Sequence, residues 1–426
     1  MKQDFIYNNI AILFCVLCYA LQSTRKTEYI RAVQVQNVFW LIGFLVYLFN
    51  IVPYYPINGT VYLSAIVYLA AFNAVYIINP GNKKIVNNNI PHKNTNDFRL
   101  NCEKQEKKCI TASVLCWIIS IPILQKTIPI LMLYGPSQGM NALRYRTYGE
   151  YSFFSTTELM LIDDIIRPIM VATILLTAQE IAQKNFNLKL IAVSITNSLW
   201  LILATAGRSL LITLVLYVFW AIIIVNGINL LKILHRYRKY IIPGLILIIG
   251  IVQIISKRIN RENGIIEEGA IYYFSGLPFF SILIKQGVAR PYTLLGKGTF
   301  SYAFDLPILL FRIAGVINRN TITGQQYLSG IASATLSVGE NIQTNATAST
   351  LLTFYSDFGV AGALIGGLCF GFFALYIEKN FKKNYNCLNF GRYIYILTAV
   401  MATTQNYPLI GIGFLMKWAF MFVLLV

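Results

Sequence analysis

Arginines stand at the boundaries between apolar runs and polar stretches, where they could bind an anion. Arg208 lies in TAGRS (residues 205–209), a short connection between two apolar runs. The other boundary arginines are Arg144, Arg146, Arg290 and Arg312. A guanidinium group stays charged when it is half buried, and its planar donors match phosphate oxygens. We therefore expect phosphate or pyrophosphate binding at these residues, or else snorkelling of Arg208 and structural pairing within the loops.

The elements that must hold these arginines are membrane helices. Of the 426 residues, 56% are hydrophobic and 12% are charged, whereas a soluble domain carries about 25% charged residues. The composition predicts an all-α polytopic membrane protein. Membrane topology accounts for most of the formal net charge of +18, and we expect no nucleic-acid partner.

About 11 apolar runs are candidates to cross a bilayer as helices. They are residues 5–22, 37–52, 61–78, 110–133, 159–179, 188–204, 209–226, 240–256, 349–376, 392–405 and 409–426. The chain then divides into an amino-terminal bundle of about eight spans (1–256), one large loop (257–345) and about three carboxyl-terminal spans (346–426). Two apolar stretches in the loop, 270–284 and 300–317, are predicted to be interfacial or re-entrant. If they span, both must span, which would give 13 transmembrane helices.

Lysine and arginine are concentrated in alternate loops, and the positive-inside rule assigns those loops to the cytoplasm. The basic loops are 23–36, 79–109, 180–189, 227–240 and 377–392. This pattern predicts an external amino terminus, a cytoplasmic carboxyl terminus, and external loops at 134–158 and 257–345. Both histidines, His92 and His235, would lie inside, so an acid or base on the outer face would not be histidine.

Some residues within the predicted spans are small or charged. A small-residue face, which favours close helix packing, is formed by Gly362, Gly366, Gly367 and Gly371. Arg167 and Lys126 lie near the outer ends of their spans, and Lys417 lies within the last one. These cations indicate a polar pathway or, for Lys417, a buried structural ion pair.

Tyrosine and phenylalanine, with 27 of each, accompany the arginines. Sugars stack their apolar faces on aromatic rings, and pyrophosphate is matched by arginine. A saccharide linked to a lipid through pyrophosphate has both features. An aromatic belt at the membrane surface also accounts for many of these rings.

The order of these features resembles the Wzy-type oligosaccharide repeat unit polymerases, also called O-antigen polymerases. The resemblance covers nearly the whole chain: many spans, the Gly-Arg turn in TAGRSLLITL, a large external loop before the last spans, and NATASTLLTFYSDFGVAG at 345–362. In addition, YYFSGLPFF at 272–280 is similar to the Tyr-x-x-x-Gly element in the family's large loop.

This resemblance implies a glycosyltransferase with a GT-C-like architecture in the bacterial cytoplasmic (inner) membrane. On the outer face it would transfer the growing chain from undecaprenyl pyrophosphate to a new lipid-linked repeat unit, building O-antigen, capsule or exopolysaccharide. No cofactor and no metal are implied. The implied partners are the undecaprenyl-pyrophosphate-linked oligosaccharide, membrane lipids, and the chain-length regulator and flippase of the same pathway.

The implied site residues lie in the same motifs. Arg208 would contact pyrophosphate as a catalytic residue, and Asp357 would act as a base or orient the substrate, unless it only caps its helix. Glu340 is the second candidate for the base. The implied binding residues are Arg144, Arg146, Arg290, Tyr272, Asn345 and Tyr355.

Two alternative functions remain open. An O-antigen ligase also uses external arginines but commonly has a histidine in its large loop, and residues 257–345 contain none. A polysaccharide flippase or other transporter would make or break no bond. Transporters favour internal repeats, charged sites at the membrane midplane and short loops, whereas this chain shows no visible repeat and concentrates its features in one long loop.

Overall fold

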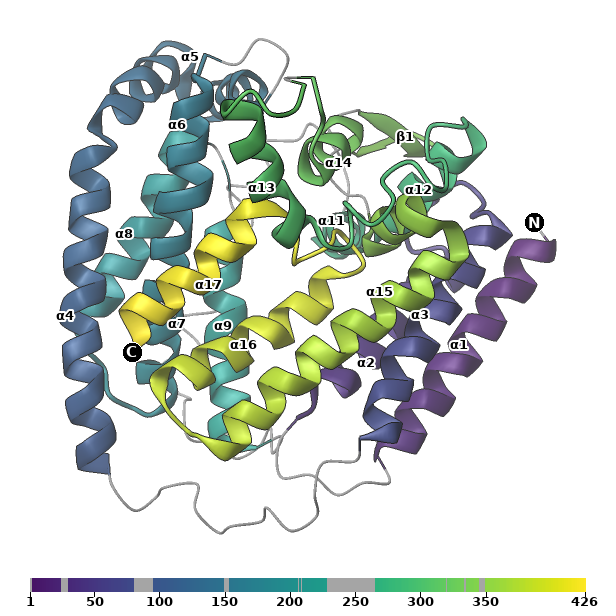
Figure 1. Cartoon of the computed structure of the whole chain (residues 1–426), viewed down its shortest axis with the longest axis horizontal. Coiled ribbons are helices and arrows are strands. Elements are labelled where there is room, and N and C mark those ends of the chain that lie inside the picture. The colour runs from purple at the N-terminus through teal and green to yellow at the C-terminus, as the bar shows by residue number, and fades with distance from the viewer. Residues whose placement is uncertain are drawn as a thin grey trace.

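The computed structural model describes residues 2–23, 30–79, 95–148, 153–205, 207, 209–227, 265–318, 320–332, 335–344 and 349–426. These residues are largely helical (Figure 1). Five of the described helices are long and apolar enough to cross a membrane, or six if one bent pair counts as a single span. The expectation of an all-α membrane protein is confirmed at this level.

The helices form one bundle that draws on both ends of the chain (Figure 1). Its amino-terminal helices are α1 (Lys2–Ser23), α2 (Ala32–Leu48), α3 (Gly59–Ile78), α4 (Thr95–Ile119), α5 (Ile121–Tyr148), α6 (Thr156–Met160), the π-helix η1 (Leu161–Ile166), α7 (Arg167–Ala182), α8 (Leu188–Thr205) and α9 (Ser209–Asn226). Its carboxyl-terminal helices are α15 (Thr350–Lys383), α16 (Cys387–Ala402) and α17 (Gly411–Leu425). A helix overlaps every predicted span except 240–256, which lies outside the described residues.

Helix α7 forms the centre of one half of the bundle. It packs against α4, α8, α9, α16 and α17, and nearly all of its side chains from Pro168 to Ala182 are buried. A helix that is apolar on every side is stable only when neighbours or lipid surround it. This central position fits the stretch from Pro168 to Ala178, which contains no charged residue.

The predicted continuous span at 110–133 is wrong in one respect, because the helix breaks at Ser120. The segments on either side of the break, 103–119 and 121–135, differ in direction by 62°. Pro122 follows directly, and proline both lacks a backbone N–H and disfavours helical geometry at the residue before it. The hydroxyl of Ser120 donates to the backbone oxygens of Cys116 (2.6 Å) and Trp117 (3.0 Å) in the last turn before the break.

The predicted small-residue face packs α15 closely onto α3. A Cβ atom added at Gly367 would meet the Tyr68 carbonyl oxygen at 2.6 Å and the Ala71 Cβ at 2.8 Å. One added at Gly371 would meet Val75 Cγ2 at 3.1 Å. The two backbones therefore approach each other as closely as small residues allow.

Replacement of Gly367 by leucine is expected to force α15 and α3 apart and to lower stability by about 3 kcal/mol, a cost typical of severe overpacking. The thermal unfolding midpoint of the purified protein in detergent measures this effect. Gly269→Leu is the control, because a Cβ atom at Gly269 has no atom within 4 Å. Equal midpoints for the two variants would contradict the close approach of the two helices.

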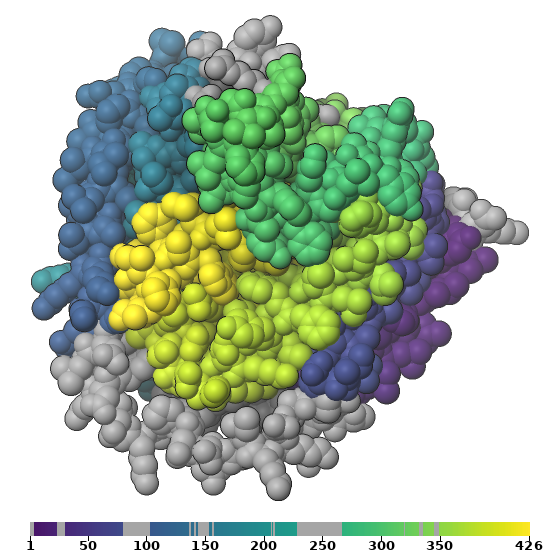
Figure 2. Space-filling model, in the orientation of Figure 1, coloured from purple at the N-terminus to yellow at the C-terminus, as the bar shows by residue number. Residues whose placement is uncertain are grey.

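Residues 265–344 fold into a separate layer at one end of the bundle, which we call the cap (Figures 1 and 2). The cap consists of α11 (Ile265–Phe274), α12 (Gly276–Lys285), α13 (Ser301–Ile313), α14 (Gly324–Ala332) and an antiparallel hairpin of β1 (Leu336–Gly339) and β2 (Ile342–Thr344). Crossing a bilayer requires about 20 helical residues. The two apolar stretches of the loop form helices of 10, 10 and 13 residues, each shorter than that length. The hairpin was not predicted, since its strands have only four and three residues.

The cap is attached to the bundle by polar contacts on several sides. The hydroxyl of Tyr54, before α3, donates to the Ala270 oxygen (3.2 Å), and the Gln405 amide, after α16, donates to the Tyr272 oxygen (2.6 Å). The Tyr407 hydroxyl donates to the Thr299 oxygen (3.0 Å). Gly276 lies against the Thr404 carbonyl, so close that a Cβ atom there would clash at 2.1 Å. These contacts fix the cap relative to the membrane helices.

Candidate functional site

Asp357 connects the bundle to the cap. It lies in α15 directly before a break at Phe358 and Gly359, and Gly359 has a φ of +62°, a conformation that favours glycine. The buried carboxylate accepts hydrogen bonds from the backbone N–H groups of residues 296, 298 and 299 at 2.8, 3.1 and 2.6 Å, and from the Thr299 hydroxyl at 2.5 Å. Both carboxylate oxygens are thus occupied by cap donors. The donors lie in the cap and not at the start of α15, so Asp357 anchors residues 296–299 and does not cap its own helix.

A second buried carboxylate, that of Asp305 in α13, organises the far side of the cap. It accepts from the backbone N–H groups of Gly324 (3.0 Å) and Gln325 (3.1 Å) at the start of α14. Burial raises the pKa of Asp305, and the two N–H donors oppose that shift. Negative charge is favourable at a helix amino terminus, so Asp305 holds α14 against α13.

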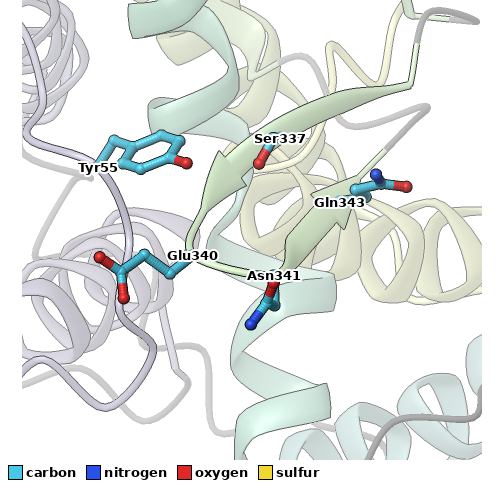
Figure 3. Close-up of a pocket in the computed structure, with 5 residues that line it drawn as sticks. All are labelled: Tyr55, Ser337, Glu340, Asn341 and Gln343. Carbon is cyan, nitrogen blue, oxygen red and sulfur yellow. The ribbon is translucent and has the colours of Figure 1, made fainter.

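A polar cavity of about 660 Å³ opens between the hairpin and the segment before α3 (Figure 3). Its lining residues are Tyr55, Ser337, Glu340, Asn341 and Gln343. Asn341 has a φ of +58°, in the left-handed region that asparagine tolerates in turns. A carboxylate, two amides and a hydroxyl beside an exposed tyrosine are groups that bind sugars, through hydrogen bonds to hydroxyls and stacking of a ring face. Glu340, the second candidate for the base, lies at this cavity.

The structure describes the side chains of three predicted binding residues. Arg290 and Tyr272 lie in the cap, and Tyr355 lies on α15. Arg290 is exposed, and its Nε donates to the Gly287 oxygen (2.7 Å). Tyr272 is 44% exposed on α11. Tyr355, on α15, packs edge-on against Phe280 of α12 with ring centroids 5.4 Å apart. Arg290 and Asp357 belong to one region, because Thr293 and Leu294 donate to the backbone oxygen of Ser356.

The remaining predicted site residues are outside what the structure describes. Arg208 and Asn345 lie outside the described residues, and the side chains of Arg144 and Arg146, in the last part of α5, do as well. Their proposed roles therefore rest on the sequence.

A cluster of four charged residues lies within the bundle beneath the cap, and only its cations were predicted from the sequence to mark a polar site. Asp163 and Asp164 are on η1, Arg167 begins α7, and Lys417 is on α17. Asp163 pairs with Arg167 at 3.0 Å. Lys417 interacts electrostatically with Asp163, Asp164 and Arg167. Two adjacent acids in the apolar stretch LIDDII were the signal that could have revealed this site, since acids within spans are rare and mark functional sites.

Comparison with known proteins gives no further assignment: no protein-family model, no curated protein and no solved structure matches this chain.

Proposed function

We propose that this protein polymerises undecaprenyl-pyrophosphate-linked oligosaccharide repeat units on the outer face of the bacterial cytoplasmic membrane. The growing chain would be transferred from its lipid pyrophosphate to a sugar hydroxyl of a new lipid-linked unit. The observation that supports this most is the cap, which sets a polar cavity of sugar-binding chemistry at one end of an apolar helical bundle. A substrate with a polyprenyl tail and a saccharide head needs both environments.

The proposed topology puts the cap outside. It has about 11 spans in a GT-C-like arrangement, an external amino terminus and a cytoplasmic carboxyl terminus. In this topology the ends of α2 and α8 and the starts of α3, α6, α15 and α17 face outward with the cap, and the basic loops face the cytoplasm. The similarity of the motif order to the Wzy-type polymerases supports the same reaction.

In a polymerase of this kind, external arginines would neutralise the charge that develops on the leaving pyrophosphate, an effect commonly worth about 3 kcal/mol. Arg208 is the first candidate for this role, and Arg144, Arg146 and Arg290 are the next. The cavity at Glu340 and Tyr55 would hold sugar units of one of the two substrates. No nucleotide sugar is needed, because the lipid pyrophosphate is itself the leaving group.

Deletion of the gene tests the proposal. We expect surface polysaccharide from the deletion strain to show a single repeat unit in place of a ladder on a gel, and the wild-type gene to restore the ladder. Arg208→Ala at normal protein level is expected to fail, with a loss of polymer of about a hundredfold or more. Lys189→Ala, an exposed basic residue at the opposite end of the bundle, is the control and should restore the ladder.

In the same experiment, Glu340→Ala tests whether the cavity contributes to polymer formation. Loss of a hydrogen bond to a charged group costs about 1.5 kcal/mol or more, so we expect about tenfold less polymer. Glu268→Ala is its control, because Glu268 lies in the cap but does not line the cavity. A ladder that persists in the deletion strain, or loss of every surface repeat including the single one, would instead indicate ligation or export.

A further inference from the structure

The charged cluster contains one complete ion pair and two charged side chains without a direct partner. Asp163 and Arg167 neutralise each other at 3.0 Å. In the described part of the chain, the side chains of Asp164 and Lys417 make no hydrogen bond and no ion pair within 4.0 Å, and both residues are half-buried. An ammonium and a carboxylate within the membrane cost several kcal/mol each when they do not touch a partner. A purely structural cluster would bring these two groups into contact.

The backbone around the cluster places the Asp164 carboxylate near the Lys417 ammonium without bringing the two groups into contact. Residues 161–166 form a π-helix, in which the N–H of Arg167 bonds to the oxygen of Ile162. Such bulges within α-helices are frequent at functional sites. On the facing helix, a Cβ atom at Gly413 would lie 3.3 Å from Asp164 Oδ1 and 3.7 Å from the Asp163 carbonyl oxygen. The missing side chain thus leaves room beside Asp164.

The depth of the cluster matches the headgroup of a membrane lipid. Lys417 is six residues from Gly411, the start of α17 on the cap side, or about 9 Å along the helix. The cap reaches that start, because the Gly411 N–H donates to the Ser301 hydroxyl (2.9 Å) and the rings of Tyr302 and Phe414 pack at 6.0 Å. An anion bound here would lie below the cap, which carries the sugar-binding cavity, and above the lipid tails.

We propose that Asp164 and Lys417 form the reacting end of the substrate site, an assignment that rests on the proposed function. Lys417, backed by Arg167, binds phosphate oxygens of the lipid pyrophosphate. Asp164 accepts the proton of the acceptor sugar hydroxyl as that oxygen forms a bond to the anomeric carbon. The bond from the anomeric carbon to the pyrophosphate oxygen breaks, and its electron pair leaves with undecaprenyl pyrophosphate. Asp163 positions Arg167 and takes no part in the proton transfer.

Two separate measurements test the two roles. The first is binding of undecaprenyl pyrophosphate to the purified protein in detergent, followed by native mass spectrometry with inorganic pyrophosphate as a competitor. We expect Lys417→Gln to bind about tenfold or more weakly, while Lys417→Arg and Asp164→Asn bind like the wild type. Competition by inorganic pyrophosphate identifies headgroup recognition, and lack of competition, with Lys417→Gln binding normally, would overturn the role of Lys417.

The second measurement is polymer formation in the deletion strain. Loss of a general base commonly costs about a hundredfold or more, so Asp164→Asn should leave single repeat units although it binds lipid normally, and Asp164→Glu should recover part of the polymer. The matched control is Lys126→Met, which removes a cation from the exposed pair with Glu158 near the same end and should restore the ladder. Every variant must elute as a single species on size exclusion.

The outcomes separate this inference from the proposed function. If the wild type restores the ladder and Asp164→Asn does so equally well, the role of Asp164 is wrong and the polymerase proposal stands. If the ladder persists in the deletion strain, the polymerase proposal and the proton transfer fail together. In that case, binding of the lipid by the wild type but not by Lys417→Gln would still support the anion-binding role of Lys417, and nothing more of the proposal.

Discussion

Asp357→Ala is expected to loosen the cap and lower the free energy of unfolding by about 3 kcal/mol or more. The substitution leaves four donors of residues 296–299 without their acceptor, and hydrogen bonds to a charged group contribute about 1.5–3 kcal/mol each. Thermal unfolding in detergent measures the loss, and limited proteolysis should cut first between residues 286 and 300. Asp357→Asn, which keeps one acceptor oxygen, should be intermediate.

The control for this prediction is the neighbouring Ser356. Its hydroxyl is buried and makes no hydrogen bond in the described part of the chain, so Ser356→Ala should unfold like the wild type. The same pair of variants also decides between the two interpretations of Asp357. An Asp357→Ala protein that is as stable as the wild type but makes no polymer would contradict the anchoring role and favour the base.

Glu378→Ala is expected to cost about 3–5 kcal/mol, because it leaves a buried arginine without its counter-ion. Glu378 accepts from Arg31 Nε at 3.1 Å and from Lys382 at 2.7 Å, and its own side chain and that of Arg31 are 1% and 3% exposed. The Arg31 guanidinium also lies over the Tyr76 ring, 4.8 Å from its centroid. The thermal midpoint and the yield of folded protein measure the effect.

Two further variants show which part of this network matters. Lys382→Ala should cost less than about 1 kcal/mol, since the Lys382 side chain is 30% exposed and lies one helical turn from Glu378. The double variant Arg31→Met, Glu378→Met should recover part of the loss, because no charge is then left buried. A double variant less stable than Glu378→Ala would rule out desolvation as the cause.

The helices could be predicted because their signal is local. Runs of apolar residues identified every bundle helix that the structure describes, and Gly367 and Gly371 were correctly assigned to close packing. The break at Ser120 could also have been predicted, since Pro122 lies within the apolar run. A run of apolar residues shows that a segment belongs in a membrane but not that it continues straight.

The site could be predicted only in part, because its contacts join distant segments. Asp357 was identified as a polar residue at the start of a span, but its partners are 58 to 61 residues away in the sequence. Asp164 and Lys417 belong to helices near opposite ends of the chain, and no spacing connects them. The cavity at Glu340 depends on a hairpin with only seven strand residues and on the bridge between its Gly339 and the distant Tyr54.

Helix α15 carries both Asp357, which holds the cap, and Glu378, which holds the buried ion network at the other end. Glu378 lies 19 positions after Gly359 along the helix, a rise of about 29 Å, which is close to the thickness of a bilayer core. Because the small-residue face packs closely on α3, we expect the part of α15 after the break at Gly359 to move together with α3. A protein that binds the end of α15 opposite the cap would therefore act on the cap from a distance of about 29 Å.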